Sequence, residues 1–135
     1  MKRLFAALPL AFMLVPSAAM AETFKTPAVD TPHGTIVAGL KLLRDGKFDD
    51  WIGKYCSKDK KCFNDQANGN LKRYNLPAMQ RRAKNCVKDG DSIEVTRTDK
   101  ISETELKIFV QCETTAMPIP FWLIKESDGW KFSNI

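Results

Sequence analysis

Few residues in this chain could carry chemistry. There is one histidine, His33, and there are four cysteines, Cys56, Cys62, Cys86 and Cys112. A nucleophile activated by a histidine base would have to use His33, but it falls in the first turn of a predicted helix, so we expect an exposed helix-start residue instead. A single histidine excludes a metal site built on several, and the chain contains no glycine-rich phosphate loop or dinucleotide fingerprint. We therefore expect neither a metal nor a cofactor.

Carboxylates and tyrosines are the remaining candidates for acid–base chemistry. Asp49 and Asp50 stand in the first turn of a predicted helix, where negative charge suits the helix dipole. Trp51 and Tyr55 lie on the apolar stripe of that helix, and Tyr74 lies in the next helical region. Core packing is the simplest interpretation of Tyr55. We assign no catalytic residue and keep Trp51, Tyr55 and Tyr74 as candidates for lining a pocket.

The first 21 residues have the three parts of a secretory signal peptide. Lys2 and Arg3 precede an apolar run over residues 4–15, and a small-residue tail ends in Ala-Met-Ala at residues 19–21. The run is shorter than the roughly 20 residues that span a bilayer. We predict cleavage after Ala21, which leaves a single domain over residues 22–135. Glu22 stands where a lipid anchor would need a cysteine, so we expect the product in the periplasm or outside the cell.

Export to an oxidising compartment changes the role that we expect for the cysteines. All four lie in the predicted domain, and an even number in a small exported protein indicates a disulfide framework. Four cysteines allow three pairings. We favour Cys56–Cys62, which would hold a short polar loop, and Cys86–Cys112, which would join a helix end to a strand. Four reduced thiols are one alternative; a zinc site is another, although no C-x-x-C pair is present.

Charge is distributed unevenly along the chain, whose formal net charge is +5. Residues 54–88 contain ten basic side chains and two acidic ones, whereas residues 89–135 contain five basic and nine acidic. A basic block on an exported domain could contact anionic lipid, cell-wall polymer or an acidic protein. Export takes it away from most nucleic acid, and a solvated face is the plainer interpretation. The basic patch consists of Lys72, Arg73, Arg81, Arg82, Lys84 and Lys88.

Apolar residues at helical spacing predict helices before residue 88. After an extended lead-in over residues 22–30, Thr31 can cap a helix whose first position is Pro32, and Gly46 can end it. Residues 48–55 form a second apolar stripe. A third helical region spans about residues 71–87, with a break near Pro77, and the polar residues 57–70 before it predict a loop.

From residue 91 the apolar period changes to two, which predicts strands. Four segments alternate in this way, and residues 127–129 carry a hairpin signal between the last two. Helices followed by strands indicate an α+β fold with an antiparallel meander. One sheet face can receive the helices through Leu106, Ile108, Val110, Phe121 and Leu123. The other face carries Phe109, Trp122 and Ile124, so either a homodimer or another part of the chain is expected to cover it.

Three short segments resemble the nuclear transport factor 2-like superfamily, in particular its small exported bacterial members. They are TPHGT at residues 31–35, DGKFD at residues 45–49 and DGWKF at residues 128–132. The resemblance extends over most of residues 31–135. It implies a curved antiparallel sheet wrapped around N-terminal helices, as a cone with a pocket. Members of that superfamily include isomerases, dehydratases, binding modules and dimerising scaffolds, so the fold leaves the function open.

The residues support two main hypotheses about function. The first is a non-catalytic binding or interaction domain of the cell envelope, which uses the pocket or the outer sheet face for a small molecule or a protein partner. The alternative is a small hydro-lyase or isomerase, which needs a buried carboxylate facing Tyr55 or Tyr74. A weaker third hypothesis has the basic patch hold the domain on an anionic surface. No nucleic-acid partner and no membrane span are expected in the domain.

Overall fold

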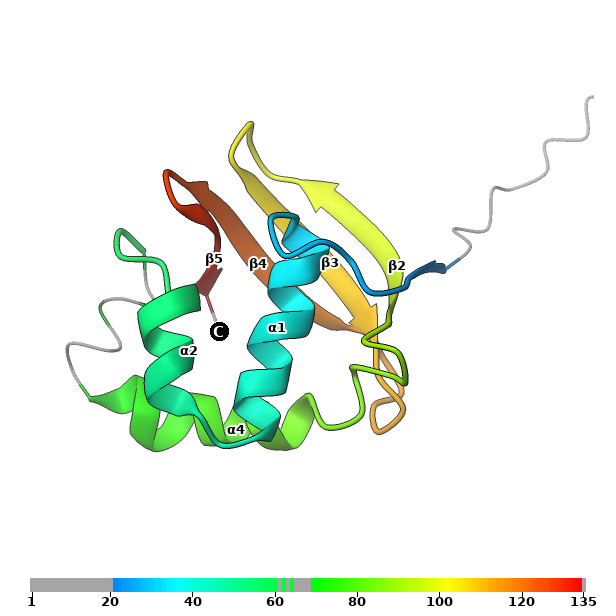
Figure 1. Cartoon of the computed structure of the whole chain (residues 1–135), viewed down its shortest axis with the longest axis horizontal. Helices are drawn as coiled ribbons and strands as arrows, with labels where there is room; N and C mark the ends of the chain where they lie inside the picture. Colours follow the sequence, from blue (N-terminus) through cyan, green and yellow to red (C-terminus); the bar gives the residue numbers. More distant parts are fainter. Residues whose placement is uncertain (1–20, 61, 63, 65–68, 135) are drawn as a thin grey trace, which may run out of the picture.

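The computed structural model describes residues 21–60, 62, 64 and 69–134. The predicted signal peptide lies outside these ranges except for Ala21, as does part of the predicted loop at 57–70. The described residues form an α+β domain with the elements β1 (Glu22–Phe24), α1 (Pro32–Arg44), α2 (Phe48–Tyr55), η1 (Leu71–Asn75), α4 (Leu76–Arg82), β2 (Ile93–Lys100), β3 (Glu105–Gln111), β4 (Ile119–Glu126) and β5 (Gly129–Asn134) (Figure 1).

Helix α1 begins and ends as its sequence predicts. The Oγ1 atom of Thr31 accepts a hydrogen bond from the Gly34 N–H at 3.0 Å, and Pro32 is the first helical residue. At the other end Gly46 has φ of +71°, in the left-handed region that glycine favours, and its N–H donates to the carbonyl of Leu43. Helix α2 follows directly and carries its acidic residues in the first turn.

The third helical region departs from the prediction. It ends at Arg82 rather than Val87, and it begins with the π-helical turn η1. Pro77 explains the wider turn, because its ring cannot fit below the carbonyl four residues earlier; the Leu76 N–H donates instead to Leu71, five residues back. Beyond the helix, Asn85 has φ of +65° and turns the chain toward β2.

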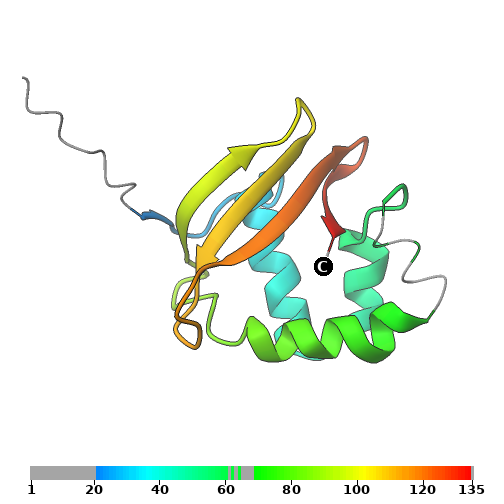
Figure 2. The ribbon, with the colours of Figure 1, turned by 180° about the vertical axis from the view of Figure 1, so that it is seen from behind.

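Strands β2 to β5 form the predicted meander, and β1, from the segment predicted as an extended lead-in, adds a fifth strand beside β2. Sheet order is β1-β2-β3-β4-β5, and every neighbouring pair is antiparallel. Figure 2 shows the sheet from the side opposite to α1. The predicted inner face is correct, since Ile108, Val110, Phe121 and Leu123 are buried and Leu106 packs against the same core.

The helices and the sheet meet closely at one point of the core. A Cβ on Gly39 of α1 would lie 2.6 Å from Cε2 of Phe132 in β5. The ring of Trp51, from α2, lies with its centroid 5.2 Å from that of Phe132. Both aromatic side chains are fully buried. Only glycine, which has no side chain, fits at position 39 of α1 against these two rings.

The outer sheet face carries aromatic rings beneath basic side chains. The Arg97 guanidinium lies 4.2 Å from the ring centroid of Phe109, and Lys107 Nζ lies 4.8 Å from that of Trp122. Phe109, Trp122 and Ile124 are each partly buried. Basic side chains attract the ring faces and cover them with aliphatic stems. The face is therefore less apolar than its sequence indicates, and homodimerisation through it stays a prediction.

Two disulfides join Cys56 to Cys62 and Cys86 to Cys112, which is the pairing favoured from the sequence. Disulfides persist in oxidising environments, so the pair indicates an extracytoplasmic location. Among the residues that the structure describes, every helix is too short or too polar to cross a bilayer.

Candidate functional site

A pocket lies where the C-terminal ends of α1 and α4 meet the segment that leads into β2. We call it the helix-end pocket. Its volume is about 290 Å³, close to the lower end of the range for small-molecule sites, about 300 Å³. The lining residues are Leu40, Leu43, Arg44, Gln80, Arg81, Ala83, Lys84, Asn85 and Val87.

The floor of the pocket is apolar and belongs to the core. Leu40 and Leu43 come from the buried face of α1 and are 4% and 1% exposed. Ala83 and Val87 pack against the same core from the other side and remain partly exposed. A ligand seated here would contact aliphatic groups that the domain already holds in fixed positions.

Basic side chains surround that floor. Arg44, Arg81 and Lys84 are all exposed lining residues. Arg44 Nε lies 3.4 Å from Asp45 Oδ1, whereas Arg81 and Lys84 have no ion pair within the described ranges. No carboxylate belongs to the described lining. Positive charge beside the pocket is thus largely uncompensated.

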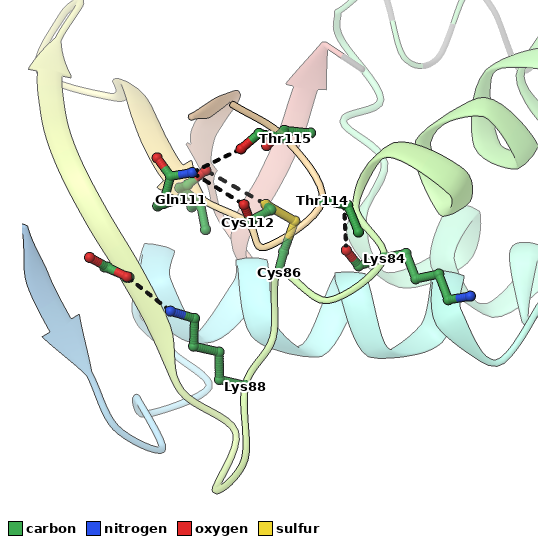
Figure 3. Close-up of a disulfide and its surroundings, with 9 residues drawn as sticks. Lys84, Cys86, Lys88, Gln111, Cys112, Thr114 and Thr115 are labelled. Carbon is green, nitrogen blue, oxygen red and sulfur yellow. Dashed lines mark hydrogen bonds and ion pairs between the residues drawn. A yellow bond between two sulfur atoms is a disulfide. The ribbon is translucent and has the colours of Figure 1, made fainter. Parts of the chain in front are cut away.

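One wall of the pocket is tied to a distant part of the sheet. Cys86, between the lining residues Asn85 and Val87, is bonded to Cys112, which directly follows β3. Next to it, Thr114 Oγ1 donates a hydrogen bond to the carbonyl of Lys84 at 3.1 Å (Figure 3). These two links fix the position of the wall, although residues 83–87 belong to neither a helix nor a strand.

The loop after Cys112 is itself held by a side chain of β3. Gln111 Nε2 donates to the carbonyl of Cys112 at 3.2 Å and to that of Thr115 at 3.1 Å (Figure 3). Cys112, which anchors the pocket wall, is therefore held by β3 before it and by the ordered loop after it.

The structure does not bring the three predicted pocket residues together. Trp51 is fully buried in the core, and no described group accepts a hydrogen bond from its Nε1. Tyr74 is 57% exposed, with the Arg73 guanidinium 5.2 Å from its ring centroid. Tyr55 borders a different hollow beside Trp130, which is larger and more open to solvent. None of the three belongs to the lining of the helix-end pocket.

The hollow beside Tyr55 also contains two carboxylates, Asp30 and Asp128, both of which are exposed. Lys131 Nζ lies 3.1 Å from Asp128 Oδ2 and donates to the carbonyl of Lys54 at 2.6 Å. The hydrogen bond from Lys131, and then its charge, lower the pKa of Asp128, which weakens this carboxylate as a base. Asp49 and Asp50 are exposed, and no carboxylate in the described ranges is buried. The buried pair that the hydro-lyase hypothesis requires is absent from those residues.

His33 is partly buried, and not the exposed residue that its position predicted. Its ring stacks on Phe24 of β1, with centroids 3.8 Å apart and planes 10° from parallel. Burial lowers the pKa of His33, against a smaller opposing effect of the Glu22 charge. The prediction missed the contact because β1 reaches the first turn of α1 only in the folded chain.

The basic patch divides into paired and unpaired residues. Lys72 Nζ lies 2.8 Å from Asp49 Oδ1, and Lys88, which is only partly exposed, lies 2.9 Å from Glu94 Oε2. The exposed members are Lys72, Arg73, Arg81, Arg82 and Lys84. Two of them, Arg81 and Lys84, line the helix-end pocket.

Sequence reasoning missed the helix-end pocket itself. Two features of the sequence point toward the pocket: Arg44 directly follows the buried Leu43, and Arg81 and Lys84 stand three positions apart. Neither signal shows that the ends of α1 and α4 meet.

Comparison with known proteins leaves the chain unassigned: no family model and no curated protein matches it. The described residues include no group of three or more histidine, cysteine, aspartate or glutamate side chains placed to hold a metal ion.

Proposed function

We propose that this chain is a non-catalytic binding domain exported to the cell envelope, and that the helix-end pocket is its binding site for a small molecule. The observation that carries the proposal is a pocket with an apolar floor and a basic rim, in which a disulfide anchors one wall. A preformed site of this kind binds without a large ordering cost.

Export is the second part of the proposal. The signal pattern of residues 1–21 supports it, and so do the two disulfides. Mass spectrometry of the protein recovered from the producing cell tests it. We expect a chain that begins at Glu22 and yields four thiols only after reduction. An intact Met1 start or four free thiols would contradict export.

The fold belongs to the proposal as well. The α+β order, with helices before a four-strand meander, supports membership of the nuclear transport factor 2-like superfamily, with N-terminal helices against a curved, cone-like sheet. Binding modules occur in that superfamily alongside enzymes. The hydro-lyase alternative has no comparable support, because Asp30 and Asp128, the two carboxylates of the hollow beside Tyr55, are both exposed, and Asp128 is ion-paired with Lys131.

Chemical-shift mapping on the isotope-labelled mature domain tests the binding site. Octanoate and octanol serve as probes, because both carry an aliphatic chain of the same length. We expect at least one of them to shift the amide signals of Leu40, Leu43 and Val87 in a saturable way. Replacing Ala83 by leucine fills the pocket and should abolish the shifts.

Ala78→Leu is the matched control, since Ala78 lies in α4, the helix that Ala83 caps at its C-terminal end, and is outside the pocket lining. It should leave the shifts intact. If neither probe shifts these amides, or if Ala83→Leu and Ala78→Leu behave alike, the helix-end pocket is not a binding site.

A further inference from the structure

We infer that the ligand of the helix-end pocket is a small anionic amphiphile, with one carboxylate or phosphate group on an aliphatic body. The inference rests on the proposed function, which makes this pocket the binding site. It adds the chemical class of the ligand, argued from the residues that surround the apolar floor.

The lining combines an apolar floor with a basic rim. Ala83 and Val87, which are partly exposed above the almost fully buried Leu40 and Leu43, offer aliphatic area at the floor, which favours a hydrocarbon group. Arg81 and Lys84 offer charged donors at the rim, and no described carboxylate competes for them. A ligand that is apolar at one end and anionic at the other matches both.

Stabilisation of the helix ends accounts for only some of the basic residues around the pocket. Basic residues in the last turn offset the partial negative charge of a helix end, and Arg44 and Arg81 occupy such positions in α1 and α4. Lys84 lies two residues beyond the last residue of α4, outside the last turn, where that effect is weaker. In α1 the terminal carbonyls of Lys41, Leu42 and Leu43 already accept backbone hydrogen bonds.

The position of Lys84 is set by the structure around it. Its carbonyl accepts the hydrogen bond from Thr114, and its side chain extends away from the disulfide (Figure 3). The backbone that presents the ammonium group is thus fixed, while the side chain remains exposed and can turn toward an anion. Gln80 and Asn85 add amide donors to the same lining.

Three probes with the same chain length, octanoate, octanol and octylammonium, separate the effect of the ligand's charge on affinity from the effect of its hydrocarbon chain. Titrations at low salt, followed by amide shifts, should give affinities in the order octanoate, octanol, octylammonium. We expect octanoate to bind about tenfold more tightly than octanol, the ratio that one charge-assisted hydrogen bond supplies. Octyl phosphate should bind at least as well as octanoate.

The variant Arg81→Gln with Lys84→Gln should lose that tenfold preference and keep its affinity for octanol. Arg82→Gln is the matched control, because Arg82 adjoins Arg81 and is also exposed but does not line the pocket. It should change the octanoate affinity less than about twofold, since an exposed charge acts weakly at a distance.

Each outcome has one meaning. Equal binding of octanoate and octanol, or an equal loss in Arg82→Gln, overturns the anionic ligand and leaves the pocket as a binding site. Failure of every probe overturns the proposed function itself. Binding to anionic phosphatidylglycerol vesicles without binding of octanoate or octyl phosphate would also overturn the inference, in favour of a membrane surface as the source of negative charge.

Discussion

Cys86 and Cys112 stand 26 positions apart and are joined by a disulfide, which ties the wall of the helix-end pocket to the end of β3. Cys56 and Cys62 close a loop of only six positions, directly after α2. The two bonds therefore differ both in the stability they confer and in their relation to the binding site.

Replacing Cys86 and Cys112 together by alanine should lower the free energy of unfolding by about 3 kcal/mol, and replacing Cys56 and Cys62 should lower it by about 2 kcal/mol, because the longer loop restricts the unfolded chain more. Urea unfolding of the mature domain measures both. The first variant should also weaken octanoate binding, and the second should not. The reverse order in either measurement would contradict the role given to Cys86–Cys112.

Gly39→Ala should destabilise the domain by about 1–3 kcal/mol, as overpacking of a core does. The new methyl group would lie 2.6 Å from Phe132 and 3.2 Å from Trp51 Nε1, and both rings are fully buried. Gly53→Ala is the control, because nothing lies within 4 Å of its Cβ position in α2; it should stabilise by about 0.5–1 kcal/mol. Thermal unfolding compares them, and equal melting temperatures would refute the close packing.

Thr31→Ala should cost about 1 kcal/mol of stability, the usual effect of losing a helix cap. The variant loses the hydrogen bond from the Gly34 N–H and the one from Thr31 Oγ1 to the carbonyl of Ala28, 2.6 Å away. Thr31→Ser keeps both and should remain within a few tenths of a kcal/mol of the parent. Urea midpoints distinguish the two, and an equal loss in both would show that the hydroxyl is not the stabilising group.

Stability should fall as the pH drops below 6.5, the ordinary pKa of histidine. Because burial lowers the pKa of His33 in the folded state, the unfolded chain takes up a proton first in this range. Stability from this source is complete above pH 6.5 and declines until the pH passes the folded pKa. The chain has no other histidine.

His33→Phe provides the control for this pH dependence, since a phenyl ring can stack on Phe24 without titrating. Unfolding in urea at pH 7.5 and 5.5 should show a decline for the parent and a much smaller one for the variant. A nuclear magnetic resonance titration should place the pKa of His33 below 6.5. A value above 6.5 would reverse the sign and refute the prediction.

Much of the fold could be predicted because its signals are local. The capping of α1 by Thr31, its end at Gly46 and the inward alternation at Ile108, Val110, Phe121 and Leu123 follow from periods and caps that neighbouring residues specify. Pro77 signalled an irregularity in the third helix, but the π turn and the early end at Arg82 depend on how the backbone satisfies its hydrogen bonds.

The candidate site was not predictable in the same way. Tyr55, Tyr74 and Trp51 have the right chemistry for a pocket, yet they occupy a hollow, the surface and the core in turn. Arg81 and Lys84 looked like part of a solvated face. They line a pocket only because the end of α1 brings Leu40 and Leu43 beside them.

The sequence by itself determined where α1 begins and ends and which strand residues face the core, because each depends on residues close together in the chain. The even number of cysteines indicated a disulfide framework, but the bond between Cys86 and Cys112, 26 positions apart, is a tertiary contact. Only the tertiary structure decided which basic residues adjoin an apolar floor, that Arg97 and Lys107 cover the outer aromatic rings, and that His33 stacks on Phe24. These relationships join residues from separate elements, and their contacts arise from packing that no local pattern specifies.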